Sequence, residues 1–147
     1  MANSFAKYPT TALPNAQFAK FSMGICDFWP IGSDTLGRLF EITYGGKWPS
    51  ERVKKVGERI FNLQRMFNVM AGFTRNDDKL PERLHKEVLR DGAPTGIIMP
   101  KDAFEKEMEE YYSCRSWDEQ GRPTIEKLKE LNIEEKLIDV YKKTLNG

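Results

Sequence analysis

The sequence predicts an all-α protein, an irregular bundle of about five to seven helices. Three observations support this fold class. The longest periodic pattern, in 49–83, repeats apolar residues at spacings of three and four, as the buried face of a helix requires. Shorter stretches with helical spacing or composition follow it at 81–89, 101–114, 124–131 and 134–145. A chain of 147 residues also fits one domain with a sizeable core.

The central helix is predicted to run from about Pro49 to Gly72. Pro49 and Ser50 suit a helix start, since the first amides have no intrahelical acceptor, and Gly72 suits a stop. We expect the other helices to pack against this one. Its predicted inward stripe consists of Val53, Val56, Ile60, Leu63, Phe67 and Met70.

The N-terminal part divides into an arm and the beginning of a helical domain. Residues 1–15 have no period and read as an extended arm, and 16–147 read as a single helical domain. Residues 17–30 are mostly apolar and end at a proline. From the residues alone they indicate a buried connector with an inert Cys26. Residues 33–42 predict a short amphipathic helix closed by Gly45 and Gly46.

The polar stretch after the central helix offers candidate acids and a base. Asp77 and Asp78 could serve acid–base or metal chemistry, but a solvated loop is favoured because Arg75 and Lys79 flank them. His85 is expected on the surface, on a helix over 81–89. In the later helices, Phe104, Met108 and Tyr111 are expected to face inward, followed by Leu137, Val140 and Tyr141.

Composition excludes several classes of protein. Lys plus Arg is 23 and Asp plus Glu is 22, so the net charge of +1 gives no general attraction to nucleic acid or anionic membrane. No run is apolar enough to span a membrane, and residues 1–11 are not a signal peptide, so a cytoplasmic location is expected. Two cysteines, Cys26 and Cys114, and one histidine are too few for a metal centre made by this chain alone.

The stretch 57–83, GERIFNLQRMFNVMAGFTRNDDKLPER, resembles a segment of the tungsten-dependent aldehyde ferredoxin oxidoreductase family, near its C-terminus. A second signature of that family is similar to Tyr111-Tyr112, Arg115-Ser116-Trp117 and Gly121-Arg122-Pro123, with Ser116 in place of the usual glycine. The resemblance extends from about Phe21 to Leu131. It implies the helical C-terminal domain of such an enzyme, with Cys114 a core or interface thiol.

The resemblance also implies a cofactor contact. Gly24-Ile25-Cys26 is similar to the second half of an Asp-x-x-Gly-Leu-Cys motif, whose cysteine is the fourth ligand of a [4Fe–4S] cluster. Cys26 is therefore the expected metal ligand, and Gly24 and Ile25 the expected cofactor-binding neighbours. Phe21 stands where the family has an aspartate that contacts the pterin, and a phenyl ring cannot replace that hydrogen bond. No catalytic residue is expected in this chain.

Two functions follow as expectations. In the first, the chain is the C-terminal portion of a tungsten- or molybdenum-pterin, iron–sulfur enzyme that oxidises an aldehyde to a carboxylate and passes electrons to ferredoxin. It would be silent alone, hold no cofactor by itself and need an N-terminal cofactor-binding partner. In the second, it is a stand-alone helical binding or scaffold module that has lost the redox chemistry. An exposed apolar patch around Gly24–Trp29 would favour a separate or lost partner.

Overall fold

The computed structural model describes residues 12–26, 28–88, 96 and 98–146. Within them the fold is all-α, as predicted, with seven helices and no strand. None of the helices in this part of the chain has the length and apolar character that crossing a membrane requires. The helices are α1 (Ala12–Ser22), α2 (Ser33–Tyr44), α3 (Ser50–Met70), α4 (Arg83–Lys86), α5 (Lys101–Arg115), α6 (Ile125–Glu130) and α7 (Glu135–Asn146), with a 3₁₀ turn, η2 (Arg75–Asp77), after α3.

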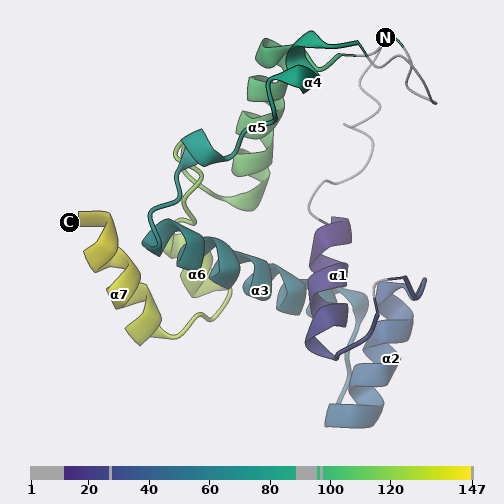
Figure 1. Ribbon diagram of the computed structural model, residues 1–147. Helices are drawn as coiled ribbons and strands as arrows, with labels where there is room; N and C mark the ends of the chain where they lie inside the picture. The colour runs from purple at the N-terminus through teal and green to yellow at the C-terminus, as the bar shows by residue number, and fades with distance from the viewer. Residues whose placement is uncertain (1–11, 27, 89–95, 97, 147) are drawn as a thin grey trace.

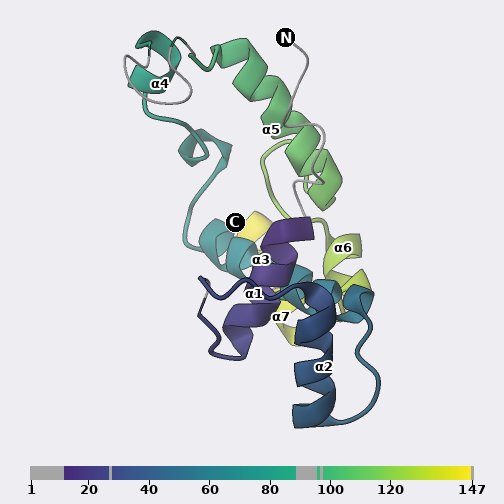
Figure 2. The ribbon, with the colours of Figure 1, turned by 90° about the vertical axis from the view of Figure 1, so that its right-hand side faces the viewer.

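Helix α3 is the central element (Figure 1). At its N-terminal end it packs with α1 and α2, and at its C-terminal end with α6 and α7. Helices α4 and α5 extend to one side of α3, away from α2, as Figure 2 also shows. The predicted bounds of α2, α3 and α5 are confirmed to within about two residues.

Two separate hydrophobic cores lie at the ends of α3. The N-terminal core joins α1, α2 and the start of α3, and the C-terminal core joins the end of α3 to α6 and α7. The buried residues of the N-terminal core are Ala19, Leu36, Phe40 and Val53. The buried residues of the C-terminal core are Met66, Val69, Leu128, Leu131, Ile133, Ile138 and Tyr141.

The two cores explain where the predicted inward stripe of α3 is wrong. Val53 is buried, but Phe67 is 69% exposed, and Met66 and Val69 are buried in its place. Partners pack on different sides of α3 at its two ends, so the buried line shifts around the helix. On α7 the face that packs in the core carries Ile138 and Tyr141, so Tyr141 is buried as predicted, whereas the prediction for Leu137 and Val140 is wrong because both are exposed.

Helix α1 lies directly against the backbone of α3. A Cβ atom added at Gly57 would lie 1.5 Å from the carbonyl oxygen of Asn15, so only glycine permits this crossing. Because α1 begins at Ala12, the extended arm predicted over 1–15 is wrong at residues 12–15, and residues 1–11 lie outside the described part. Pro14 falls in the first turn of α1, where a missing amide costs no hydrogen bond.

The predicted helix over 81–89 is shorter than expected. Only Arg83–Lys86 is helical, and Leu84 and Val88, the apolar residues that a helix over 81–89 would turn inward, are 37% and 52% exposed. Pro81 and the return of the chain toward Met99 limit it to one turn, with the Met99 amide donating to the Leu84 carbonyl. The sequence also suggests a short extended segment at 97–100, but residues 89–95 and 97 lie outside the described part of the chain.

Candidate functional site

The residues Gly24, Ile25 and Cys26 form the stop of helix α1. The Ile25 amide donates to the Lys20 carbonyl and the Gly24 amide to the Phe21 carbonyl, which together make a Schellman motif. Gly24 has φ +71°, the left-handed conformation that this motif needs and that glycine adopts at no steric cost. The backbone conformation of the motif therefore explains why glycine occurs at position 24. This conformation also sets the direction of the chain that follows.

The side chains around this turn hold Cys26 at the surface. Ile25 and Met23 pack against the N-terminal core and anchor the turn. The Trp29 amide donates to the Cys26 carbonyl at 3.2 Å, and the Lys20 ammonium donates to the Trp29 carbonyl at 3.3 Å. Cys26 itself is a free, exposed thiol. The three residues of the predicted site thus have different roles: Gly24 bends the chain, Ile25 anchors it against the core and Cys26 is exposed.

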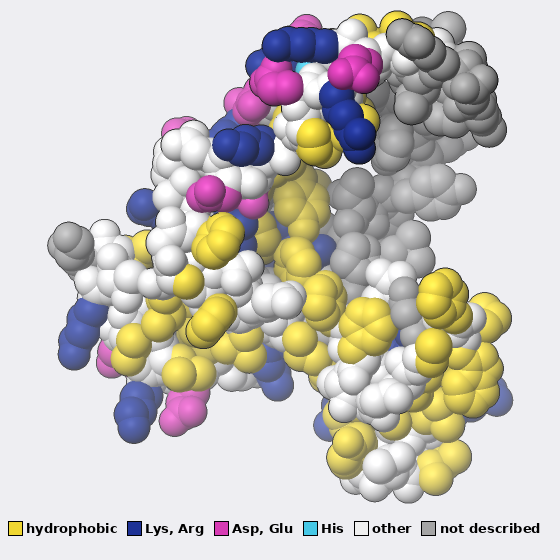
Figure 3. Space-filling model, in the orientation of Figure 1, with side chains coloured by type: hydrophobic (Ala, Val, Ile, Leu, Met, Phe, Trp, Pro, Cys, Tyr) yellow, Lys and Arg dark blue, Asp and Glu magenta, His cyan; other side chains and the backbone are white. Residues whose placement is uncertain are grey.

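Three large aromatic side chains that lie close to Cys26 in the sequence are exposed to solvent. Phe28 is 97% exposed, Trp29 60% and Phe21 48%. Figure 3 shows that hydrophobic side chains gather over α1 and α2. Phe28 and Trp29 thus expose apolar surface within Gly24–Trp29, and from the sequence such a patch would favour a separate or lost partner.

A row of aromatic rings connects Phe21 to the interior. Starting at Phe21, successive ring centroids are separated by 6.2, 5.0 and 5.7 Å along Phe18, Phe61 and Trp117. Trp117 donates its indole N–H to Asn62 Oδ1 at 2.8 Å, which satisfies a fully buried amide. The row therefore links Phe21, at the end of α1, to Phe61 of α3 and to Trp117. Sequence analysis missed it because its rings come from α1, α3 and the loop after α5.

Arg115, inside the second family signature, is fully buried beside this row. Its guanidinium lies 4.2 Å from the Phe61 ring centroid and donates to Asn15 Oδ1 at 2.6 Å. Its Nη2 has no hydrogen-bond partner among the described residues. The spacing of Tyr111 and Arg115, one helical turn apart, was the signal that could have placed them together.

Asp77 is exposed, as the solvated loop favoured by the sequence requires, but Asp78 is half-buried, and both acids accept hydrogen bonds within the chain. Asp78 is bound by the Arg65 guanidinium, with Nη1–Oδ1 at 2.8 Å, and accepts the Tyr112 hydroxyl at 2.5 Å. Burial and the Asp78 carboxylate raise the pKa of the Tyr112 phenol. Asp77 caps η2, and bonds from the Thr74 amide and hydroxyl lower its pKa. Asp78 thus joins α3 to α5 beside η2, whereas Asp77 caps η2 locally.

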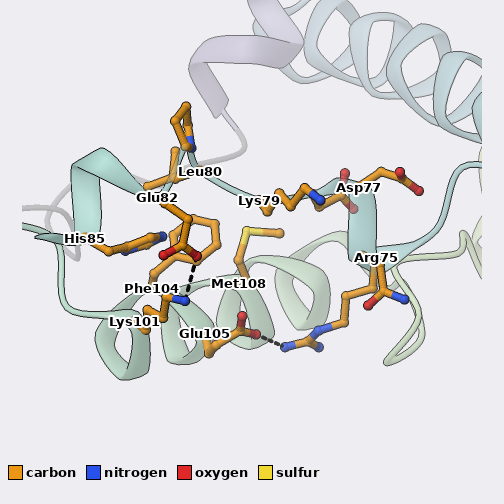
Figure 4. Close-up of a pocket in the computed structure, with 13 residues that line it drawn as sticks. Arg75, Asp77, Lys79, Leu80, Glu82, His85, Lys101, Phe104, Glu105 and Met108 are labelled. Atoms are coloured by element: carbon orange, nitrogen blue, oxygen red, sulfur yellow. Dashed lines mark hydrogen bonds and ion pairs between the residues drawn. The ribbon is translucent and has the colours of Figure 1, made fainter.

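A cleft of about 670 Å³ lies between the 75–85 segment and α5 (Figure 4). Phe104 and Met108 contribute apolar surface to it, and two ion pairs span it, Glu82–Lys101 at 2.7 Å and Arg75–Glu105 at 2.8 Å. The Lys101 ammonium, followed by Lys86, lowers the pKa of Glu82 to about 2. Four of the charged residues that line the cleft are therefore paired with one another.

His85 and Cys114 do not join the turn at Cys26. His85 is partly buried, contrary to the expected surface position, and its Nδ1 lies 2.7 Å from the Met99 carbonyl oxygen. Cys114, expected in a core or interface, is exposed on α5, which excludes the core. Among the described residues no three of His, Cys, Asp or Glu gather closely enough to hold a metal ion. Cys26 stands as a single donor.

Comparison with known proteins agrees with the resemblance. A family model described as domains 2 and 3 of aldehyde ferredoxin oxidoreductase matches residues 10–133. The tungsten-containing aldehyde ferredoxin oxidoreductase of Pyrococcus abyssi is 36% identical over 115 residues, 76% of this chain and 18% of the relative. That of Pyrococcus furiosus is 35% identical over 117 residues, 78% of this chain and 19% of the relative.

A relative with a different name also matches. The aliphatic sulfonate oxidoreductase, WOR-like subunit, of Pyrococcus furiosus is 32% identical over 105 residues, 67% of this chain and 17% of the relative. The chain thus spans about one fifth of the length of the curated relatives that it matches.

Proposed function

This chain belongs to the aldehyde ferredoxin oxidoreductase family, and we propose that it serves as the C-terminal helical portion of a tungsten-pterin, iron–sulfur enzyme of that kind. The complete assembly would oxidise an aldehyde with water to a carboxylate and pass the electrons to ferredoxin. We expect the chain to be catalytically silent alone, because it matches only about one fifth of the length of the relatives that carry the activity in their names. The N-terminal, cofactor-bearing part completes it.

The observation that carries this proposal is the exposed thiol of Cys26 on a rigid helix stop. A thiolate is the usual ligand of iron in a [4Fe–4S] cluster. The turn is open on the Gly24 side, where a Cβ atom would meet no heavy atom within 4 Å. Donor chemistry and access therefore fit one cluster ligand from this chain. The cluster, when bound, supplies the route by which electrons leave the tungsten centre.

The residues fit the pterin less well than the cluster. Phe21 is exposed and its ring lies edge-on to Phe18, so it offers no hydrogen-bond acceptor where the family motif has a carboxylate. The role of this chain toward the pterin is then limited to shaping the nearby wall. Recognition of the pterin falls to the N-terminal part.

A test uses the full-length Pyrococcus furiosus relative with its matching segment replaced by this chain. In this chimera we expect Cys26→Ala to lower the iron content per polypeptide and to change the electron paramagnetic resonance signal of the cluster. Cys114→Ala is the matched control, because Cys114 is also a free, exposed thiol. It should leave both readings unchanged. Unaltered iron content and signal in the Cys26→Ala chimera would remove the proposed ligand.

A second candidate function is a helical scaffold that has lost the redox chemistry. Phe21 favours it, because the substitution removes a pterin contact that an active enzyme of the family would use. Size and metal content of the protein purified from its native host separate the two. A complex with tungsten and iron supports the enzyme, and a metal-free monomer or homodimer supports the scaffold.

A further inference from the structure

We propose that a small cavity between α3 and α5 binds a neutral molecule with one aromatic ring and one carbonyl or hydroxyl group, such as an aromatic aldehyde or alcohol. The cavity has a volume of about 190 Å³ and lies next to the larger cleft, with which it shares Asp78 and Met108. The inference goes beyond the proposed function and does not depend on it, because side chains of this chain alone form the cavity.

The apolar part of the cavity lining is mostly aromatic. It consists of Phe61, Met108, Tyr111 and Trp117. The Phe61 and Trp117 rings are stacked, with centroids 5.7 Å apart and 5° between their planes, and the Tyr111 ring meets Trp117 edge-on at 5.8 Å. Aromatic rings gain energy from offset or edge-on contacts of this kind. A ligand with an aromatic ring would therefore extend a cluster that already exists.

Contacts within the chain hold this lining in place. Trp117 is almost fully buried and donates its indole N–H to Asn62 Oδ1. Arg65 donates from Nε to the Gly121 carbonyl at 2.7 Å, and its guanidinium carbon lies 5.1 Å from the centroid of the Trp117 ring. The cavity is therefore largely preformed, so a ligand binds without the cost of ordering loose side chains.

The charges at the cavity favour a neutral ligand. Among the described residues, the charged side chains that line it are Arg65 and Asp78, and they bind each other, with Nη1–Oδ1 at 2.8 Å. Asp78 also accepts the Tyr112 hydroxyl. Both charges are thus compensated within the chain. Because burying an ionic group without a counter-charge is costly, a carboxylate is a poorer ligand here than a neutral group of the same shape.

Two side-chain amides remain for hydrogen bonding to a ligand. Gln64 and Asn68 line the cavity one helical turn apart, on the same face of α3 as Phe61. Neither side-chain amide forms a hydrogen bond with another residue in the described part of the chain. Each amide can donate and accept. A carbonyl or hydroxyl group on the ligand would therefore find a partner, and Asn68 is the better placed because it is half-buried.

The volume limits the size of the ligand. An engineered apolar cavity of about 150 Å³ in another protein holds benzene. The cavity of about 190 Å³ therefore has room for one ring and a few further atoms. Fused-ring compounds and nucleotides are too large for it.

The test titrates the isotope-labelled chain with benzamide and follows its three tryptophan indole signals by NMR. We expect millimolar benzamide to shift the Trp117 signal and to leave those of Trp29 and Trp48 unchanged, because neither residue lines the cavity. Trp29→Phe and Trp48→Phe variants assign the signals. Benzoate, which has the same shape and a negative charge, should bind at least about tenfold more weakly than benzamide.

Three variants locate the binding site. Met108→Trp should fill the cavity and weaken benzamide binding at least about tenfold. Phe104→Trp is the matched control, because Phe104 lies one turn earlier on α5 and lines the larger cleft but not the cavity (Figure 4). It should leave the affinity unchanged. Asn68→Leu should weaken binding about threefold or more, because it removes the hydrogen-bonding amide.

Far-UV circular dichroism checks that the variants fold. If Met108→Trp loses helix content, Asn68→Leu decides the test, because Asn68 belongs to neither hydrophobic core. A Trp117 signal that benzamide does not move would overturn the inference. So would benzoate binding as tight as that of benzamide, undiminished binding to folded Met108→Trp, or equal weakening by Phe104→Trp.

Discussion

Ser116 adopts an unfavourable backbone conformation that lowers the stability of the fold without preventing it from forming. It ends α5 with φ 55° and ψ 44°, the left-handed conformation, and its amide bonds to the Tyr112 and Ser113 carbonyls. A residue with a side chain loses roughly 1–2 kcal/mol in this conformation. The sequence resemblance has glycine at this position, and the backbone explains why.

Ser116→Gly should therefore stabilise the protein. Relief of the left-handed conformation outweighs the extra entropy of the unfolded glycine, for a net gain of about 0.5–1 kcal/mol in the free energy of unfolding. Urea denaturation followed by circular dichroism measures it. Asn132→Gly is a matched control, since Asn132 also has positive φ, 53°, but asparagine tolerates it better, so its gain should be smaller. A loss of stability in Ser116→Gly would contradict the strain.

At the scale of elements, the crossing of α1 over α3 sets the position of the thiol. The crossing is close because Gly57 has no side chain, and the C-terminal stop of α1 then delivers Cys26 to the surface. A glycine inside an exposed helix usually weakens it by about 1 kcal/mol relative to alanine. At Gly57 the absent side chain permits the contact between α1 and α3, so glycine is expected to stabilise the protein here relative to alanine.

Gly57→Ala is expected to destabilise the protein by about 1–3 kcal/mol or more, as overpacking does. The new Cβ would lie 1.5 Å from the Asn15 carbonyl oxygen, so α1 has to move. Thermal unfolding measures the cost, and hydrogen exchange should show faster exchange in α1 than in α7. Gln64→Ala, at an exposed position of the same helix, should change stability by less than about 0.5 kcal/mol. Increased stability in Gly57→Ala would refute the close crossing.

The elements differ in how far the sequence could predict them. Helices α2, α3 and α5 follow from apolar spacing, because each buries a face along its length. The exposure of Phe67 and Val140 could not be predicted, since it depends on which helices pack at each end of α3. The resemblance to the family could be recognised from the sequence, but the exposed position of Cys26 could not be predicted. It depends on the geometry of a helix stop, which Gly24 only suggests.

At the scale of the whole molecule, two tyrosines tie distant parts together. Tyr112 donates to Asp78 where α5 meets η2, and the Tyr141 hydroxyl donates to the Pro123 carbonyl in the C-terminal half at 3.2 Å. Burial raises the pKa of both phenols above the ordinary value of 10.0. The folded protein therefore keeps protons that the unfolded chain releases in alkali.

Stability should consequently fall as the pH rises above about 10, by up to about 1.4 kcal/mol per pH unit for each tyrosine. Below that pH the contribution of the two tyrosines to stability is fully present, because their phenols are then protonated in both the folded and the unfolded state. Unfolding free energies at several alkaline pH values measure the slope, and Tyr112→Phe or Tyr141→Phe should make it shallower. Tyr44→Phe is the control, since Tyr44 is 62% exposed. An unchanged slope in both buried variants would contradict the shifted pKa values.

The placement of the two cores at opposite ends of α3 has a consequence for the proposed assembly. The core beside Cys26 has four buried members and the distal one seven. A small core contributes little stabilising free energy, so the part of the chain around it unfolds more easily on heating. A partner that covers the smaller end adds its binding free energy to the half of the chain that most lacks cohesion. Binding of the Cys26 sulfur to iron and stabilisation of the C-terminal end of α1 would then occur together.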